Sequence, residues 1–150
     1  MRSAKLTALL SLLSLLGLIV WAACSSPPRF AGSDAAQACA GTGAFTGADP
    51  QRGLAAYERD CAACHSLKDD KTRPQGPNLQ GIVSRRIGSA PGFRYSKAFR
   101  NRQDVWTLEA LDRYLQDPEW SYPGTRMRYM GMVDPDERRD VIALLACEAR

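Results

Sequence analysis

The segment Cys61-Ala62-Ala63-Cys64-His65 constrains this chain more than any other part of its sequence. Two thiols separated by two residues can reach the two vinyl groups of one porphyrin and form thioether bonds with them. A histidine directly after the second thiol then lies under the iron and binds it through an imidazole nitrogen. The spacing therefore predicts one covalently attached haem, held by Cys61 and Cys64, with His65 as an iron ligand.

Two other uses of a C-x-x-C pair are weighed against this interpretation. A disulfide oxidoreductase motif normally follows a strand in a βαβ unit, and the surrounding sequence shows no such pattern. A tetrahedral zinc site needs two further Cys or His ligands at short spacing, whereas His65 is the single histidine of the chain. Covalent haem is the reading that the motif favours.

The sixth iron ligand must come from a residue other than histidine. The segment Pro123-Gly124-Thr125-Arg126-Met127 offers a thioether, a soft and neutral ligand that raises the reduction potential of haem iron. Its proline and glycine favour an irregular turn that can hold Met127 across from the haem. Met130 and Met132 follow closely and could compete, and a lone methionine is often an ordinary core residue. The residues alone leave this choice open.

Length and charge limit the function classes. A chain of 150 residues has room for one compact domain plus accessory segments. Its net charge of +4 comes from 20 Lys and Arg against 16 Asp and Glu. Two of these basic residues, Arg2 and Lys5, lie in a segment that we expect to be removed, which leaves 18 minus 16, or +2. A charge this small and scattered predicts that nucleic acid is not a partner.

The first residues resemble an export signal. Arg2 and Lys5 precede an apolar run from Leu9 to Ala23, and Trp21-Ala22-Ala23-Cys24 resembles a bacterial lipobox. We expect residues 1–23 to be a lipoprotein signal and Cys24 to carry the lipid. An uncleaved membrane anchor and ordinary cleavage without a lipid remain open. Each alternative places the rest of the chain on the periplasmic side of a bacterial cell envelope, where cysteines are oxidised.

Residues 24–48 are rich in Ser, Pro, Gly, Ala and Thr, and we interpret them as a flexible tether. The haem domain is then expected over 49–150. Local signals predict helices that begin at Asp49-Pro50, Ser96, Thr107 and Asp134-Pro135, with no persuasive strand. Loops are expected over 66–92 and 118–132. This pattern predicts an all-α domain.

Two of the predicted helices have features that bear on packing. Gly53 and Tyr57 share one face of the first helix, which predicts a close helix crossing at Gly53. The last helix carries an apolar set that we expect in the core, namely Val141, Ile142, Leu144 and Leu145.

From about Asp49 to Arg150 the chain resembles class I cytochromes c of the mitochondrial and related bacterial type. The resemblance rests on the haem motif and on Gly76-Pro77-Asn78-Leu79, Gly88-Ser89-Ala90-Pro91-Gly92-Phe93-Arg94-Tyr95, Trp106, Tyr114-Leu115 and Tyr122-Pro123-Gly124-Thr125-Arg126-Met127. It implies the cytochrome c fold, in which helices wrap one covalent haem c and the first and last helices cross. It also implies an electron-transfer protein without catalytic residues.

The resemblance assigns roles to individual residues. It makes Met127 the second axial ligand beside His65, and it implies that the other ring nitrogen of His65 donates to the Pro77 carbonyl. Tyr114 is expected near the Met127 sulfur, and Thr125 is expected to add a hydrogen bond in the same loop. The inner haem propionate would be held by three further residues, Arg85, Tyr95 and Trp106.

The chain also departs from the family. Phe99 lies where the family often has a polar Asn, which puts the buried polar network near the haem in doubt. Glu119, Trp120 and Ser121 stand where lysines and an aromatic residue would be expected. Docking to the acidic patch of a mitochondrial-type oxidase is therefore not implied.

Cys39 and Cys147 are left once the haem and lipid cysteines are assigned. Because the first and last helices cross in this family, the two could meet and form a disulfide in an oxidising compartment. The alternative is a buried free Cys147 and a loose Cys39.

The predicted function is a membrane-tethered carrier of single electrons between respiratory or photosynthetic redox partners, by Fe(III)/Fe(II) cycling. A quinol-oxidising complex would be the donor, and a terminal oxidase, reductase or photosynthetic centre the acceptor. The alternative is a fixed haem subunit that relays electrons inside a larger membrane oxidoreductase. A peroxidase or gas sensor needs an open coordination site, and a Met127 ligand argues against one.

Overall fold

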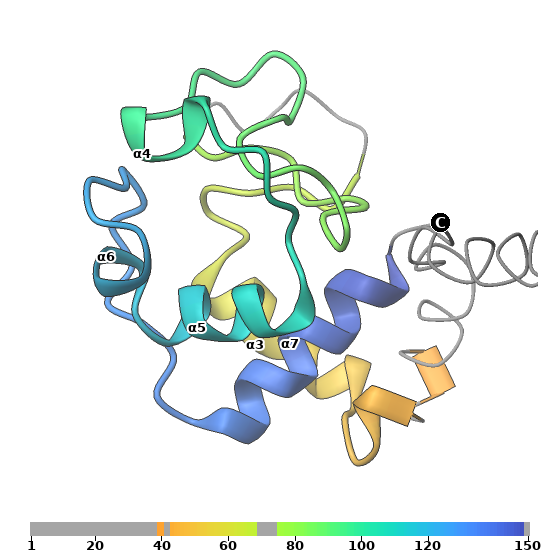
Figure 1. The fold of residues 1–150 in the computed structure, drawn as a ribbon. Coiled ribbons are helices and arrows are strands. Elements are labelled where there is room, and N and C mark those ends of the chain that lie inside the picture. Colours follow the sequence, from red (N-terminus) through yellow and green to blue (C-terminus); the bar gives the residue numbers. More distant parts are fainter. Residues whose placement is uncertain (1–38, 41–42, 69–74, 149–150) are drawn as a thin grey trace, which may run out of the picture.

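A computed structural model describes residues 39–40, 43–68 and 75–148 of the chain (Figure 1). The predicted signal, Cys24 and most of the predicted tether lie outside these residues. Within them the helices are η1 (Gly43–Phe45), α3 (Pro50–Asp60), α4 (Lys97–Arg100), α5 (Leu108–Gln116), α6 (Pro118–Ser121) and α7 (Pro135–Cys147). A single antiparallel bridge between Arg86 and Val105 is the extent of β pairing in the described ranges. The described fold is all-α, as predicted.

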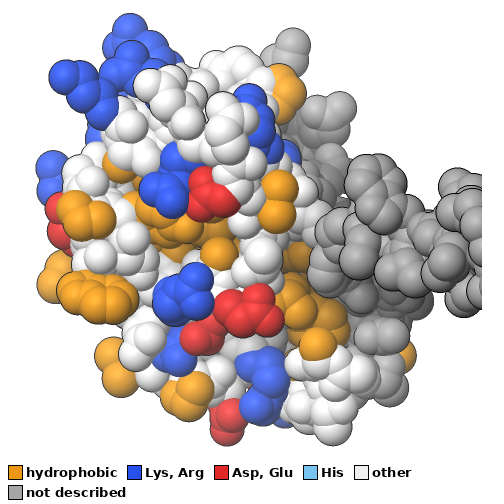
Figure 2. All heavy atoms as spheres, viewed as in Figure 1, with side chains coloured by type: hydrophobic (Ala, Val, Ile, Leu, Met, Phe, Trp, Pro, Cys, Tyr) orange, Lys and Arg blue, Asp and Glu red, His pale blue; other side chains and the backbone are white. Residues whose placement is uncertain are grey.

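Two further features are the distribution of charge on the surface and the length of the helices. Basic and acidic side chains both occur on the face drawn in Figure 2, with apolar side chains at its centre. None of the helices in the described part of the chain is long and apolar enough to span a bilayer.

Three helices begin with the same Asp-Pro pair. The side chains of Asp49, Asp117 and Asp134 accept hydrogen bonds from backbone N–H groups in the first turn of α3, α6 and α7. The proline that follows each has no N–H to leave unpaired and already has a helical φ. The prediction of a loop over 118–132 is wrong at its start, because Asp117-Pro118 opens the four-residue helix α6.

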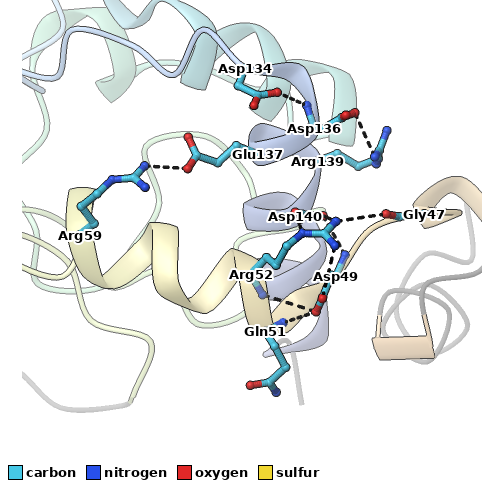
Figure 3. A network of polar contacts seen from close by, with 10 residues as sticks. All are labelled: Gly47, Asp49, Gln51, Arg52, Arg59, Asp134, Asp136, Glu137, Arg139 and Asp140. Atoms are coloured by element: carbon cyan, nitrogen blue, oxygen red, sulfur yellow. Dashed lines mark hydrogen bonds and ion pairs between the residues drawn. The ribbon is translucent and has the colours of Figure 1, made fainter.

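Helices α3 and α7 cross at Gly53, which confirms the predicted close contact. A Cβ atom built on Gly53 would lie 2.2 Å from the Asp140 carbonyl oxygen, so only glycine fits at this separation. Two ion pairs flank the crossing (Figure 3): Arg52 Nε lies 2.8 Å from the Asp140 carboxylate, and Arg59 Nη2 lies 2.8 Å from Glu137 Oε1. Asp140 is buried, and it also accepts from the Asp49 backbone N–H at 2.7 Å.

The core lies where α7 meets α3 and α5. The four residues of α7 expected there are all buried, with at most 5% of their surface exposed. Leu111, Tyr114 and Leu115 bury the facing side of α5. The side chains of α7 are buried on several sides because α3 and α5 both pack against this helix.

The predicted tether contributes to this core at its C-terminal end. Phe45, in η1, is 2% exposed and belongs to the main hydrophobic cluster. The structure also joins Cys39 to Cys147 in a disulfide, with the two Cα atoms 5.1 Å apart. The packed region therefore begins before the domain boundary expected at residue 49.

Candidate functional site

The C-x-x-C-H segment follows directly on the last turn of α3. The Cys61 N–H donates to the Tyr57 carbonyl at 2.8 Å, and the His65 N–H donates to the Cys61 carbonyl at 3.0 Å. The Tyr57 hydroxyl donates to the His65 carbonyl at 2.8 Å. These bonds fold the motif into a tight turn, with Cys61 buried, Cys64 half-buried and neither thiol in a disulfide. Burial raises the pKa of the Cys61 thiol to about 11.

The His65 ring is fixed in one orientation. Its Nδ1–H donates to the Pro77 carbonyl oxygen at 2.7 Å, the bond that the sequence resemblance implies. A Cβ atom on Gly76 would lie 2.5 Å from His65 Cε1, so the glycine lets this loop close on the ring. Burial lowers the pKa of His65, which favours the neutral imidazole. With Nδ1 protonated, Nε2 carries the lone pair that a metal ion can bind.

Residues 125–133, which we call the Met127 segment, contain three methionines that differ in burial. Met130 is 95% exposed, and Met132 is 3% exposed in the core, where its N–H bonds to the Leu115 carbonyl. Met127 is half-buried and packs against the main core cluster. Met127 is therefore the one of the three that is neither largely exposed nor enclosed in the core.

Two further predicted residues hold the backbone beside Met127. The Tyr114 and Thr125 hydroxyls share a buried hydrogen bond of 2.9 Å. The Met127 N–H donates to the same Thr125 Oγ1 at 3.2 Å. Burial raises the pKa of Tyr114 to about 12, so its hydroxyl stays protonated. The structure therefore connects α5 to the start of the Met127 segment.

The three residues expected around a propionate also lie together. The Trp106 N–H bonds to the Arg85 carbonyl at 2.9 Å, next to the Arg86–Val105 bridge. Arg85 donates to the Gln80 and Asn78 carbonyls at 3.1 and 2.7 Å, and burial lowers its pKa. Burial raises the pKa of nearby Tyr95, and the Arg85 guanidinium offsets part of this rise. Arg85 is thus a half-buried cation whose described hydrogen-bond partners are neutral carbonyls.

Sequence reasoning did not single out Ser96, which directly follows Tyr95. Its Oγ is buried and has no hydrogen-bond partner among the described residues, and it does not cap α4 although it occupies the N-cap position. Buried polar atoms are nearly always paired, so an orphaned hydroxyl indicates a missing acceptor or donor. The local sequence gives no signal that singles out Ser96, because it resembles an ordinary N-cap residue. Only the folded structure shows that its hydroxyl is buried and does not cap the helix.

Phe99 lies at the centre of an aromatic cluster. It is 5% exposed, and its ring centroid lies 5.1 to 6.2 Å from those of Tyr95, Trp106, Tyr114 and Tyr122. Its main chain packs against Gly88, where a Cβ atom would lie 2.2 Å from the Phe99 carbonyl oxygen. The sequence departure at this position therefore adds apolar packing between the propionate residues and Tyr114.

These residues fit a haem. The orphaned Ser96 hydroxyl and the Arg85 cation suit a buried carboxylate such as a propionate, because a buried anion needs donors and an opposite charge. The two free thiols would supply the attachment points, and the oriented imidazole would supply one iron ligand. The thiols, the imidazole, Arg85 and Ser96 thus offer the kinds of groups that a covalent haem needs.

Comparisons with known proteins identify the family of this chain. Residues 50–146 match the family model described as cytochrome c. The chain is 36% identical over 105 residues to cytochrome c2 of Rhodomicrobium vannielii, covering 70% of this chain and 83% of that protein. It is 39% identical over 102 residues to cytochrome c type-1 of Ascaris suum, covering 68% of this chain and 90% of that protein.

A solved structure gives the same result for the fold. Cytochrome cH from Methylobacterium extorquens superposes with a TM-score of 0.59 at 34% identity, covering 65% of this chain and 96% of that one. The family-model match, over residues 50–146, includes the thiols, the oriented histidine and Met127. The chain belongs to the cytochrome c family and binds one covalently attached haem c.

Proposed function

We propose that this electron-transfer cytochrome holds its haem iron between His65 and Met127 and carries one electron at a time with both ligands retained. The observation that carries the proposal is the fixed tautomer of His65, whose Nδ1–H is used by Pro77 and whose Nε2 is left for the metal. The half-buried position of Met127, held through Thr125 to α5, supports the second ligand. A thioether favours reduced iron and suits an electron carrier.

The optical spectrum of the ferric protein tests this ligand pair. A weak sulfur-to-iron charge-transfer band in the far red is expected in the wild type, and Met127→Ala should lose it. Met130→Ala serves as the matched control, because its side chain is 95% exposed, and it should keep the band. A high-spin wild-type spectrum without the band would overturn the proposal and favour a sensor or peroxidase.

We further propose that the haem domain is tethered to a membrane on the periplasmic side of a bacterial envelope. The support is the sequence pattern of a positive start, an apolar run and Ala22-Ala23-Cys24. A lipid on Cys24 would let the domain reach a quinol-oxidising donor and an oxidase, reductase or photosynthetic acceptor. Cys24→Ser should then release the cytochrome into the soluble fraction, whereas retention in the membrane would favour an uncleaved anchor.

A fixed subunit of a larger oxidoreductase is the second candidate. The exposed apolar side chains Trp120 and Met130, at 76% and 95%, favour it because they offer contact area to another protein. Purification from mild detergent distinguishes the two candidates. A free carrier runs alone, and a fixed subunit runs with a constant ratio of other chains.

A further inference from the structure

We propose that Tyr129 is a positioning residue for Met127, and that its hydrogen bond to Asp60 latches the Met127 segment onto the end of α3. This inference rests on the proposed ligation by Met127. The Tyr129 hydroxyl donates to Asp60 Oδ2 at 3.3 Å across 69 positions of sequence. The half-buried ring packs against the main core cluster, so the contact joins two parts of the chain that flank the site.

The Met127 segment is fixed firmly at both ends. At its start, Thr125 is bonded to Tyr114 of α5. At its end, the Met132 N–H bonds to the Leu115 carbonyl at 2.8 Å. The buried Arg138 adds hydrogen bonds of 2.8 Å to the Met132 and Val133 carbonyls. These contacts hold residues 125 and 132–133, and they leave the middle of the segment to be held by other groups.

The middle of the segment, residues 126–130, is largely exposed. Arg126, Arg128 and Met130 are exposed, and Arg126 donates to the Arg94 carbonyl, next to Tyr95 in the sequence. Tyr129 makes its contact to Asp60 at the end of α3, and it lies two residues from Met127, which we propose as a ligand. A stretch with few buried contacts opens more readily than the core around it. A bond at Tyr129 therefore bears directly on how often Met127 leaves the haem.

The acceptor is itself anchored. Arg59 donates from Nε and Nη2 to the two Asp60 oxygens, at 2.9 and 2.6 Å. The same Nη2 lies 2.8 Å from Glu137 Oε1 at the start of α7. Asp60 also directly precedes Cys61, one of the two proposed haem attachment points. The Tyr129–Asp60 hydrogen bond thus connects the Met127 segment to α3, the helix that leads into the haem motif. Arg59 holds the accepting carboxylate in place.

The test measures how fast added imidazole displaces Met127 in the ferric holoprotein, followed by loss of the far-red band. Tyr129→Phe keeps the ring and removes the hydroxyl. It should raise the displacement rate about five- to tenfold, because a hydrogen bond to a charged acceptor is stronger than one between neutral groups. Hydrogen exchange should also become faster at residues 128–130, a readout that does not depend on the haem.

Two further variants separate the latch from general destabilisation. In an Asp60→Ala background, Tyr129→Phe should have no additional effect, because its acceptor is already gone. Asp104→Asn is the matched control, since it breaks an exposed Arg102–Asp104 pair at 2.9 Å elsewhere, and it should leave the rate unchanged. Equal displacement rates in wild type and Tyr129→Phe, or additive effects in the double variant, would overturn the latch. A wild-type protein without the far-red band would instead overturn the ligation on which it rests.

Discussion

Gly53→Ala is expected to destabilise the folded protein through the crossing of α3 and α7. The added Cβ would lie 2.2 Å from the Asp140 carbonyl oxygen and 2.6 Å from its carbonyl carbon. Both atoms belong to the backbone of α7, so neither can turn aside as a side chain would. The two helices would have to separate by about 1 Å, because carbon atoms in contact normally lie about 3.5 Å or more from their neighbours.

The magnitude follows from three effects. Overpacking of a tight contact costs about 1–3 kcal/mol. Separation also weakens the hydrogen bond from the Asp49 N–H to the buried Asp140 carboxylate, and such a bond to a charged group contributes about 1.5–3 kcal/mol when lost. Alanine favours the helix by about 1 kcal/mol relative to glycine, and this gain offsets part of the loss. The expected net loss is about 1.5–5 kcal/mol of unfolding free energy.

The assay is guanidinium unfolding of the holoprotein, followed by far-UV circular dichroism. Ala55→Gly is the matched control, because Ala55 is exposed on the same helix and changes propensity without packing. It should lose about 1 kcal/mol. If propensity governed position 53, Gly53→Ala would gain stability while Ala55→Gly lost it. A Gly53→Ala protein as stable as wild type would refute the packing argument.

Three further outcomes are expected. Replacing Cys39 and Cys147 together by serine should lower the free energy of unfolding by about 3–5 kcal/mol, because their disulfide closes a loop of 108 positions. Denaturant unfolding with and without reductant measures this contribution, and equal unfolding midpoints would contradict the prediction. Ser84→Gly should raise the unfolding midpoint, because a residue with a Cβ atom is strained by about 1–2 kcal/mol at the Ser84 φ of 65° and glycine is not. A lower midpoint in the variant would contradict this prediction. Arg59 lowers the pKa of Asp60 below its ordinary 3.8, so this carboxylate stabilises the fold above that pH and its contribution is lost as the pH falls. Asp60→Asn should accordingly narrow the difference in unfolding free energy between neutral and acid pH, and an unchanged difference would exclude this role.

Much of the site follows from short stretches of sequence. The haem motif, the Gly76-Pro77 contact with the His65 ring and the Asp-Pro helix starts each depend on a few neighbouring residues. The prediction failed for α6, where one Asp-Pro signal opens a helix of only four residues. Such a helix has too little apolar periodicity to stand out from the surrounding loop.

The sequence by itself determined that the chain attaches a haem, that its folded part is helical and that Gly53 marks a crossing. These properties depend on spacing and local backbone preference, which the order of residues contains. Only the tertiary structure decided that Phe45 belongs to the core, that the Ser96 hydroxyl is buried with no partner among the described residues, and that Tyr129 meets Asp60. Those facts depend on contacts between distant segments. The residues at both ends of such a contact look ordinary until the packed helices bring them together.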